Sequence, residues 1–502
     1  MKKRFTRILA VLIGVLAMFG ATACGENDKE NGENNSENVK IVVPDRITSK
    51  KGLNAWKLQR QEEFKKAYPH IEVEYKANPT GDPAKNIQTI INNLSNQEMG
   101  YTLLIANSNT YARTVYQSKL ICDMSEYLTE EQISKYNPDV LAGYYDGDAL
   151  VGLPFGIEFP LLGFNRKHLQ SEYVKRQLGV DPSAADANEQ VEAIIDSIET
   201  WDDFLEIAKK LSGTYVVSGK NVTVSGYGGY LTDYYIGLGV WNVANGYNTV
   251  TQHESGKMDI DMTNLQTVET LEFLQTLKKE GALTHNTNLG YTDFFNQIFQ
   301  NKIASFIYYP SWATSWFEPN GIFASDIKVI NIPYGPSIER LKEQTKTDSS
   351  IEVPPTNVNF SVSYVLNSRA TEEQKRAAIT YIMFMQGEDA IYDQIEFAKE
   401  NMVSMIAVPP YNFDDEYLSN TLFANIPQDW KKALTNSIKH NYVLNQNSDA
   451  FIQYIATAVP GIVNGQDGSG TYNTRESLLE RLEALNGTIY SQFLNGYNSN
   501  FD

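Results

Sequence analysis

Four aromatic residues stand at or just beyond the end of an apolar run that predicts a strand over residues 303–309: Tyr308, Tyr309, Trp312 and Trp316. Pro310 and Ser311 carry Trp312 away from the strand into a loop, where the binding residues of proteins are concentrated. Such rings can stack on the apolar C–H faces of a sugar, and Trp312, Trp316 and Tyr309 are the candidates. The alternative is core packing, and alternation along the strand predicts it for one of the two tyrosines.

Polar side chains that could hydrogen-bond the hydroxyl rim of the same ligand follow other predicted strands. Glu158 comes directly after the run LPFGI, with a solvated loop carboxylate as the alternative. A glycine- and tyrosine-rich segment over 226–242 supplies Tyr230, Asp233 and Trp241, with core packing as the alternative for the aromatic residues.

Nearer the N-terminus, three more candidates follow predicted strands: Arg46, Asn107 and Tyr111. Asp45 and Ser108 also follow these predicted strands, and their side chains could reach the same ligand. Turn capping is the alternative for Asp45 and Asn107, because short polar side chains commonly hydrogen-bond nearby backbone in turns.

Sequence signatures of catalysis and of metal or phosphate binding are missing. The five histidines are scattered without metal-ligand spacing, and no Gly-x-Ser-x-Gly motif occurs. The glycines of 226–229 are not followed by Gly-Lys-Ser/Thr, and Cys122 lies in an apolar context that favours packing. The acidic pairs Asp146/Asp148 and Asp259/Asp261 lack the pattern of a calcium loop. We therefore expect no cofactor, no metal and no catalysis, although the many carboxylates leave a glycosidase pair possible.

The first 38 residues have the pattern of an export signal followed by a tether. Residues 1–23 combine a basic start with an uncharged apolar run from Ile8 to Gly20, which is short for a membrane span. Ala21-Thr22-Ala23-Cys24 resembles the bacterial lipobox, so Cys24 is the expected lipidation site; ordinary cleavage after Ala23 is the alternative. Residues 25–38 contain no apolar side chain, so 24–38 should form a disordered leash that leaves the folded body outside the membrane.

Length and composition indicate a large globular body. The 502 residues are 42% hydrophobic and 21% charged, which fits two large domains or three smaller ones. Loss of the four basic residues in 1–23 would lower the formal charge from −19 to −23. Such an acidic surface repels phosphate backbones, so we expect no nucleic-acid partner.

Strand and helix patterns alternate along the body, which predicts an α/β fold with mostly parallel sheets. Expected strands lie at 39–43, 71–75, 101–106, 161–164, 303–309, 327–332 and 360–366. Expected helices lie at 54–68, 87–94, 264–279, 294–299, 371–386, 430–439 and 475–494, and another begins at Thr200, the predicted N-cap. The segment 337–357 is polar and contains prolines, which indicates an exposed loop.

The order of these segments resembles that of the extracellular solute-binding proteins of ABC importers, in their maltose-binding-protein-like carbohydrate branch. The similar stretches are FKKAYPHIEVE (64–74), QSKLICDM (117–124), DALVGLPFGIE (148–158) with GFN (163–165), TWDDF (200–204), NKIASFIYYPSW (301–312) and VINIPYGP (329–336). One departure is Gly100-Tyr-Thr before the strand that leads to Asn107, where the family usually has Pro-Asp.

The resemblance implies two discontinuous α/β lobes, 39–156 with 330–368 and 157–329 with 369–502, joined by hinge crossings. A carbohydrate, and by its many aromatic candidates an oligosaccharide, would bind between the lobes. Trp312 matches the family's stacking tryptophan and Glu158 its hydroxyl-binding acid. The implied partners are the importer's permease and ATPase subunits, and the implied place is the outer face of a bacterial membrane, with a Gram-positive surface favoured and a periplasmic face possible. A binding protein for another solute and a secreted carbohydrate-active enzyme are the alternatives.

Overall fold

The computed structural model describes most of the folded body. The described residues are 38–45, 47, 51–77, 92–94, 100–106, 109–217, 220–253, 257–284, 304–311, 313, 323–401, 403, 408–412, 426–439, 441–443 and 450–499. Contacts divide the chain after Asn38, and residues 39–502 form one unit. Among the described residues, none of the helices has both the length and the apolar character needed to span a bilayer.

The first group of strands is built around β15 (Asn357–Leu366), which pairs antiparallel with both β3 (Leu103–Ala106) and β6 (Leu153–Glu158). β3 and β6 are therefore parallel to each other, and both run in the direction of the amino end of β15: the last residue of β3, Ala106, pairs with Ser363, and the last residue of β6, Glu158, pairs with Phe360. A parallel pair, β1 (Val39–Asp45) and β2 (Ile71–Ala77), is linked to β3 through a hydrogen bond from Thr102 N to Val42 O of 2.9 Å.

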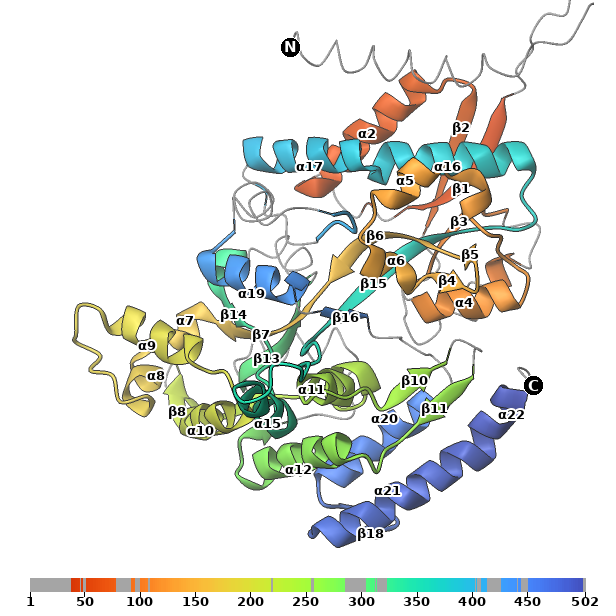
Figure 1. The fold of residues 1–502 in the computed structure, drawn as a ribbon. Helices are drawn as coiled ribbons and strands as arrows, with labels where there is room; N and C mark the ends of the chain where they lie inside the picture. Colours follow the sequence, from red (N-terminus) through yellow and green to blue (C-terminus); the bar gives the residue numbers. More distant parts are fainter. Residues whose placement is uncertain are drawn as a thin grey trace, which may run out of the picture. The chain divides into compact units, whose positions relative to one another are not determined.

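Helices from distant parts of the chain cover this group (Figure 1). α2 (Leu53–Ala67) packs against α16 (Glu372–Gln386) and α17 (Glu388–Glu400), and α16 also packs on β1. The ring of Phe64 lies 5.2 Å from that of Tyr381, in an edge-on contact that joins α2 to α16. The expected lobe boundary at 368 places these two helices in the other lobe. Their apolar faces are instead buried against α2 and β1.

The second group is a six-stranded sheet. Its strands follow the order β12 (Leu283–Thr284), β9 (Lys220–Gly228), β13 (Ala304–Pro310), β7 (Pro160–Asn165) and β14 (Ile327–Ile330), with β8 (Gly213–Val217) pairing to β9. β12, β9 and β13 are parallel, β7 is antiparallel to β13, and β14 is antiparallel to β7. The expectation of mostly parallel sheets is therefore wrong, because both groups mix the two directions. β15 is antiparallel to β3 and β6 in the first group, and in the second sheet β7 is antiparallel to its two neighbours and β8 is antiparallel to β9.

Helices around the second sheet and at its edges complete the body. They are α7 (Arg166–Leu169), α8 (Glu172–Gln177), α9 (Ala187–Asp196), α10 (Trp201–Leu211), α11 (Val240–Ala244), α12 (Leu265–Lys279), α15 (Pro336–Thr345), α19 (Gln428–Lys439), α20 (Ala450–Val463), α21 (Arg475–Ile489) and α22 (Asn495–Asn498). α10 packs so closely on β9 that a Cβ on Gly226 would lie 2.1 Å from Ala208 O. The predicted N-cap is confirmed: Thr200 and Asp203 form a capping box at the start of α10.

The remaining elements are short helices and short strands, most of the strands in two-stranded hairpins. They are α4 (Asn109–Gln117), α5 (Glu130–Ser134), α6 (Pro138–Ala142), β4 (Tyr145–Asp146), β5 (Ala149–Leu150), β10 (Val250–Gln252), β11 (Met258–Ile260), β16 (Asn441–Val443), β17 (Gln466–Asp467) and β18 (Gly470–Thr471). The prediction of an exposed loop over 337–357 is wrong for the first part of that segment. α15 forms there because Pro336 suits the first turn, Asn245 Oδ1 accepts from Ser337 N at 2.8 Å, and Ile338 is buried.

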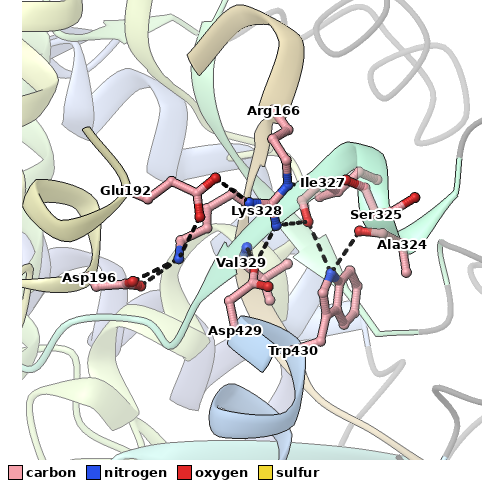
Figure 2. A network of polar contacts seen from close by, with 10 residues as sticks. All are labelled: Arg166, Glu192, Asp196, Ala324, Ser325, Ile327, Lys328, Val329, Asp429 and Trp430. Atoms are coloured by element: carbon pink, nitrogen blue, oxygen red, sulfur yellow. Dashed lines mark hydrogen bonds and ion pairs between the residues drawn. The ribbon is translucent and has the colours of Figure 1, made fainter. Parts of the chain in front are cut away.

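A segment late in the chain connects the two groups of strands. α19 packs on β14, the edge strand of the second sheet, and β16 then pairs in parallel with β15. Figure 2 shows how α19 is fastened: Asp429 accepts from Val329 N at 3.0 Å and from the Arg166 guanidinium at 3.1 Å. The indole of Trp430 donates to the carbonyl of Ile327 at 3.0 Å. The bonds satisfy edge-strand backbone that would otherwise be unpaired.

Candidate functional site

The strand connectivity brings several chain ends to one place. β6 ends at Glu158 and β7 starts at Pro160, so a single residue, Phe159, joins the two groups of strands. Pro160 pairs with Pro310 at the end of β13, and Gly228 at the end of β9 pairs with Ile307. We call this place the junction edge: the carboxyl ends of β6, β9 and β13 with the amino end of β7. Ligands of open α/β sheets bind outside the carboxyl ends of strands.

Phe159 is held firmly at the junction edge. Its N–H donates to Ser311 Oγ at 3.0 Å, and its carbonyl accepts from Ser311 N at 2.9 Å. Both residues are fully buried. Ile157 N also donates to Val408 O at 2.7 Å. Glu158 lies between these two fixed residues and is half-buried, so its carboxylate projects from rigid backbone.

Tyr308 of β13 lies within electrostatic reach of two acidic side chains. Burial raises the pKa of this phenol well above its usual range, and the nearby charges of Asp233 and Glu158 raise the pKa further. The hydroxyl group therefore stays protonated near neutral pH and is available as a hydrogen-bond donor. A carboxylate at the end of β6 and another in the turn that follows β9 thus both act electrostatically on a tyrosine of β13.

Asp233 is oriented by the backbone that follows it. Its Oδ1 accepts from Tyr235 N at 2.9 Å and from Ile236 N at 3.1 Å, at the start of the π-helical turn η3 (Tyr235–Gly239). Burial raises the pKa of this carboxyl, and the two backbone donors offset part of the rise. Tyr230, half-buried, lies close enough for Asp233 to raise its pKa, which burial raises more.

The first group of strands contributes a second polar cluster beside Glu158. The hydroxyl of Tyr144 donates to Ser361 O at 2.8 Å and lies 2.8 Å from Ser361 Oγ. Burial raises the pKa of Tyr144, Glu158 raises it further, and Arg113 of α4 lowers it. Glu158 therefore acts on tyrosines of both groups, Tyr144 on one side and Tyr308 on the other.

Three predicted site residues lie in the core. Trp241 is fully buried, with its indole 3.2 Å from the Tyr227 hydroxyl and its ring 5.5 Å from that of Phe204. Tyr309 is fully buried against Trp430 of α19, with ring centroids 5.9 Å apart. Tyr111 is only 7% exposed. The packing of these three agrees with the core alternative, because large aromatic surface is stabilising when buried, and their assignment to a ligand site stays a prediction.

Other predicted residues lie outside the described ranges: Arg46, Asn107, Trp312, Trp316 and the lipidation residue Cys24. Ser108 and the expected helix at 294–299 lie outside them as well. Their assignments stay predictions. Asp45 is described, and its Oδ1 accepts from Ile47 N at 2.8 Å, which is the turn capping given as the alternative.

Sequence reasoning did not select three residues of the electrostatic cluster around Glu158: Tyr308 and Tyr144, on which Glu158 acts, and Arg113, which acts on Tyr144. For Tyr308 the sequence indicated only that it or Tyr309 should be buried. No local pattern marks Tyr144 or Arg113, because the partners of Tyr144 lie 217 residues further along the chain. Among the described residues no cluster of three or more His, Cys, Asp or Glu side chains could hold a metal ion.

Solved structures of similar shape are solute-binding proteins. A solute-binding protein of an ABC transporter from Thermotoga lettingae, bound with α-D-tagatose, has a TM-score of 0.63 at 16% identity, over 90% of this chain and 99% of that one. A maltose/maltodextrin-binding domain from Bdellovibrio bacteriovorus, bound to maltotriose, has a TM-score of 0.60 at 13% identity, over 90% and 100%. UgpB from Mycobacterium tuberculosis, in complex with glycerophosphocholine, has a TM-score of 0.57 at 13% identity, over 89% of this chain and 98% of that one.

These similarities show a two-lobed, periplasmic-binding-protein-like fold. Among curated proteins, no sequence matches the chain. A family model described as bacterial extracellular solute-binding protein matches residues 59–401, well over half of the 502 residues. The chain therefore belongs to the bacterial extracellular solute-binding proteins.

Proposed function

We propose that this protein captures a carbohydrate at the junction edge and delivers it to the permease of an ABC importer. One observation carries the proposal: Glu158 and Asp233 both act electrostatically on Tyr308, and Glu158 lies beside the single buried residue that joins the two groups of strands. The carboxylates accept hydrogen bonds from sugar hydroxyl groups, and the protonated tyrosine donates one. A ligand held there would contact both lobes and favour their closed arrangement.

The apolar faces of the sugar require aromatic partners. Trp312 directly follows Ser311, whose backbone and hydroxyl are bonded to Phe159 at the junction edge. We propose Trp312 and Trp316 as the stacking residues, with the partly buried Tyr230 as a third. Several rings would suit an oligosaccharide, since each ring covers about one sugar face.

The anchor is part of the same proposal. Cys24 would carry the lipid, and residues 25–38 would tether the body to the outer face of the membrane, favouring a Gram-positive surface. Stable anchoring by lipid takes more than one acyl chain, as in a doubly or triply acylated cysteine. Mass spectrometry of the membrane fraction would detect the acylated Cys24 peptide, and a C24A variant should be released into the medium.

Two other functions share parts of this evidence. A non-sugar solute, such as the glycerophosphocholine bound by the M. tuberculosis protein, would use the same fold. A secreted carbohydrate-active enzyme would use Glu158 and Asp233 as an acid and a nucleophile, and it would release product. The family and the similar structures are binding proteins, which favours binding without chemistry.

The test uses residues 39–502, which form one unit. Thermal unfolding is measured with a panel of mono- and oligosaccharides that includes tagatose and maltotriose, and with glycerophosphocholine. A ligand that binds only the folded protein stabilises it by about 2.7 kcal/mol at a hundredfold excess over Kd. We expect a selective shift with a sugar, its loss in Trp312→Ala, and an intact sugar afterwards by chromatography. A shift with glycerophosphocholine alone would reject the sugar; sugar breakdown would reject pure binding.

A further inference from the structure

The first crossing between the two groups of strands is held from the side of the first group at Ile157. Its N–H donates to Val408 O at 2.7 Å. The segment 408–412 is itself fixed to the first group, because the Tyr411 hydroxyl donates to Gln386 O, at the end of α16, at 2.7 Å. Ile157 is therefore tied to the first group.

The next residues of this crossing are held by the second sheet. Phe159 exchanges two hydrogen bonds with Ser311, which directly follows β13, and β7 begins at the residue after Phe159. Glu158 lies between Ile157 and Phe159. The change from one group to the other therefore falls on this single residue.

The second crossing, along β15, divides at the residue opposite Glu158. Ser361 is held by the first group, because the Tyr144 hydroxyl donates to its carbonyl at 2.8 Å. Residues 357–359 pair instead with β16. Phe360 lies between these two sets of contacts, and its partner in the ladder of β6 and β15 is Glu158.

β16 is in turn fastened to the second sheet through α19. Beyond the contacts in Figure 2, Asn331, directly after β14, donates to Ala433 O at 3.0 Å and to Ser437 Oγ at 2.8 Å. One residue separates α19 from β16. We call residues 426–439 and 441–443 the strap. It bonds to β14 of the second sheet, and it pairs with the amino end of β15.

The contacts on either side of this line are costly to break. Trp430 and Ser437 of the strap are fully buried, as are Phe159 and Ser311, so their hydrogen-bonding groups would lose partners that water does not replace locally. A change of backbone torsion at Glu158 and at Phe360 breaks none of these hydrogen bonds. Movement between the two groups therefore costs least at this pair of residues.

We propose that the strap and the amino end of β15 form one mechanical unit with the second sheet, and that the two groups pivot about the paired residues Glu158 and Phe360. Hinged closure is common to two-lobed folds, and the inference concerns where this chain divides and which segment holds β15 to the second sheet. It goes beyond the proposed function, because it does not depend on the solute.

The experiment measures amide hydrogen exchange of residues 39–502 without ligand, by mass spectrometry with fragmentation that resolves single amides. Residues that open together exchange with a common opening free energy. In the wild-type protein, the protected amides of 357–359 and of β16 should share the opening free energy of α19. Those of 361–366 should follow β3 and β6.

Two variants should act on opposite sides of the pivot. Asp429→Ala removes a bond of α19 to β14, so exchange in the strap and in 357–359 should become about tenfold faster, as for one lost buried hydrogen bond, with 361–366 unchanged. Tyr144→Phe removes the bond to Ser361 and should accelerate 361–366 without affecting the strap. Glu206→Ala, on the exposed face of α10, should change neither.

Circular dichroism checks that each variant is folded. If Asp429→Ala is not, Asn331→Ala, which removes two other bonds of α19, replaces it, and the wild-type pattern tests the inference in either case.

Three results would overturn the inference. Wild-type amides of 357–359 that follow β3 and β6 would show that the strap does not hold β15. Equal acceleration of all of β15 in both variants would show a single unit without a pivot. An effect of Asp429→Ala that extends to Val362 would move the boundary to the register shift between Val362 and Ser363. The absence of binding by any sugar would reject the proposed function and leave this inference intact.

Discussion

Ser311 and Phe159 hold each other through two hydrogen bonds, one in each direction, at the point where the chain passes from one lobe to the other. Both residues are completely buried, so neither bond is shared with water. Phe159 directly follows Glu158, and Ser311 directly precedes Trp312, so the pair fixes the backbone next to both candidate residues. The rigidity of this part of the chain therefore depends on an uncharged serine.

Ser311→Ala should destabilise the protein. The substitution leaves the buried N–H of Phe159 without its acceptor, and an unsatisfied buried donor costs about 1–3 kcal/mol. Urea unfolding of residues 39–502 measures the change. Ser134→Ala is the matched control, because that hydroxyl is exposed and caps only Glu131 O. If Ser311→Ala lowers the free energy of unfolding no more than Ser134→Ala does, the hydrogen bonds between Ser311 and Phe159 are dispensable for stability.

The Asp429–Arg166 contact should be worth far more than a surface ion pair. Asp429 is 9% exposed and also accepts from Val329 N, so Asp429→Ala leaves that backbone donor unsatisfied, while the Arg166 guanidinium keeps its pairing with Glu192. We expect a loss of about 1–3 kcal/mol, the cost of an unsatisfied buried donor. Glu206→Ala, which removes the exposed partner of Lys210, should cost no more than about 1 kcal/mol. Denaturant unfolding measures the free energy of unfolding of both variants. Equal losses of stability in Asp429→Ala and Glu206→Ala would show that the Asp429–Arg166 contact contributes no more than a surface ion pair.

Trp241 should matter for stability and not for binding. Trp241→Phe keeps a large ring in the core and loses the indole bond to Tyr227. The sugar affinity of this variant should stay within about twofold of the wild type, whereas Trp241→Ala should cost about 3–5 kcal/mol of stability. Calorimetric titration and urea unfolding report the two effects. A tenfold weaker affinity in folded Trp241→Phe would restore it as a ligand residue.

Cys122 should be unreactive in the folded protein. Burial raises the pKa of its thiol to about 11, against an ordinary value of 9.0. Because the thiolate is the nucleophile, alkylation by iodoacetamide at pH 8 should be about a hundredfold slower in native protein than in urea. A raised pKa also means that stability contributed by the neutral thiol is complete below pH 9 and is lost as the pH rises towards 11. Residues 39–502 contain no other cysteine, so the mass shift is unambiguous. Equal alkylation rates in native protein and in urea would show that the Cys122 thiol is not buried.

Local features of the sequence predicted local structure well. The capping box at Thr200 depends on two residues three positions apart, and it is present. The strand at β13 and the helix at α12 follow from apolar patterns within single segments. The packing of α16 on β1 could not be predicted in this way, because it joins segments more than 300 residues apart.

In the candidate site, too, local features could be predicted from the sequence and long-range contacts could not. Glu158 is a candidate because of its place at the end of an apolar run, and its role stays a prediction. Core packing was an alternative for Trp241, but the sequence could not name its aromatic neighbours, because they come from segments on both sides of it. The polar partners of Glu158 also come from several elements, so only the assembled fold shows that Tyr308 and Tyr144 lie around one carboxylate.

The central claim is that the carboxylate of Glu158 binds the sugar. The most direct test is a calorimetric titration of the best-binding sugar into wild-type protein, Glu158→Ala and Glu131→Ala. Loss of a charged hydrogen-bond acceptor costs about 1.5–3 kcal/mol, so Glu158→Ala should weaken Kd at least tenfold. Glu131→Ala, which removes an exposed acid on α5, should leave Kd unchanged. An unchanged Kd in folded Glu158→Ala would contradict the claim and place the ligand elsewhere.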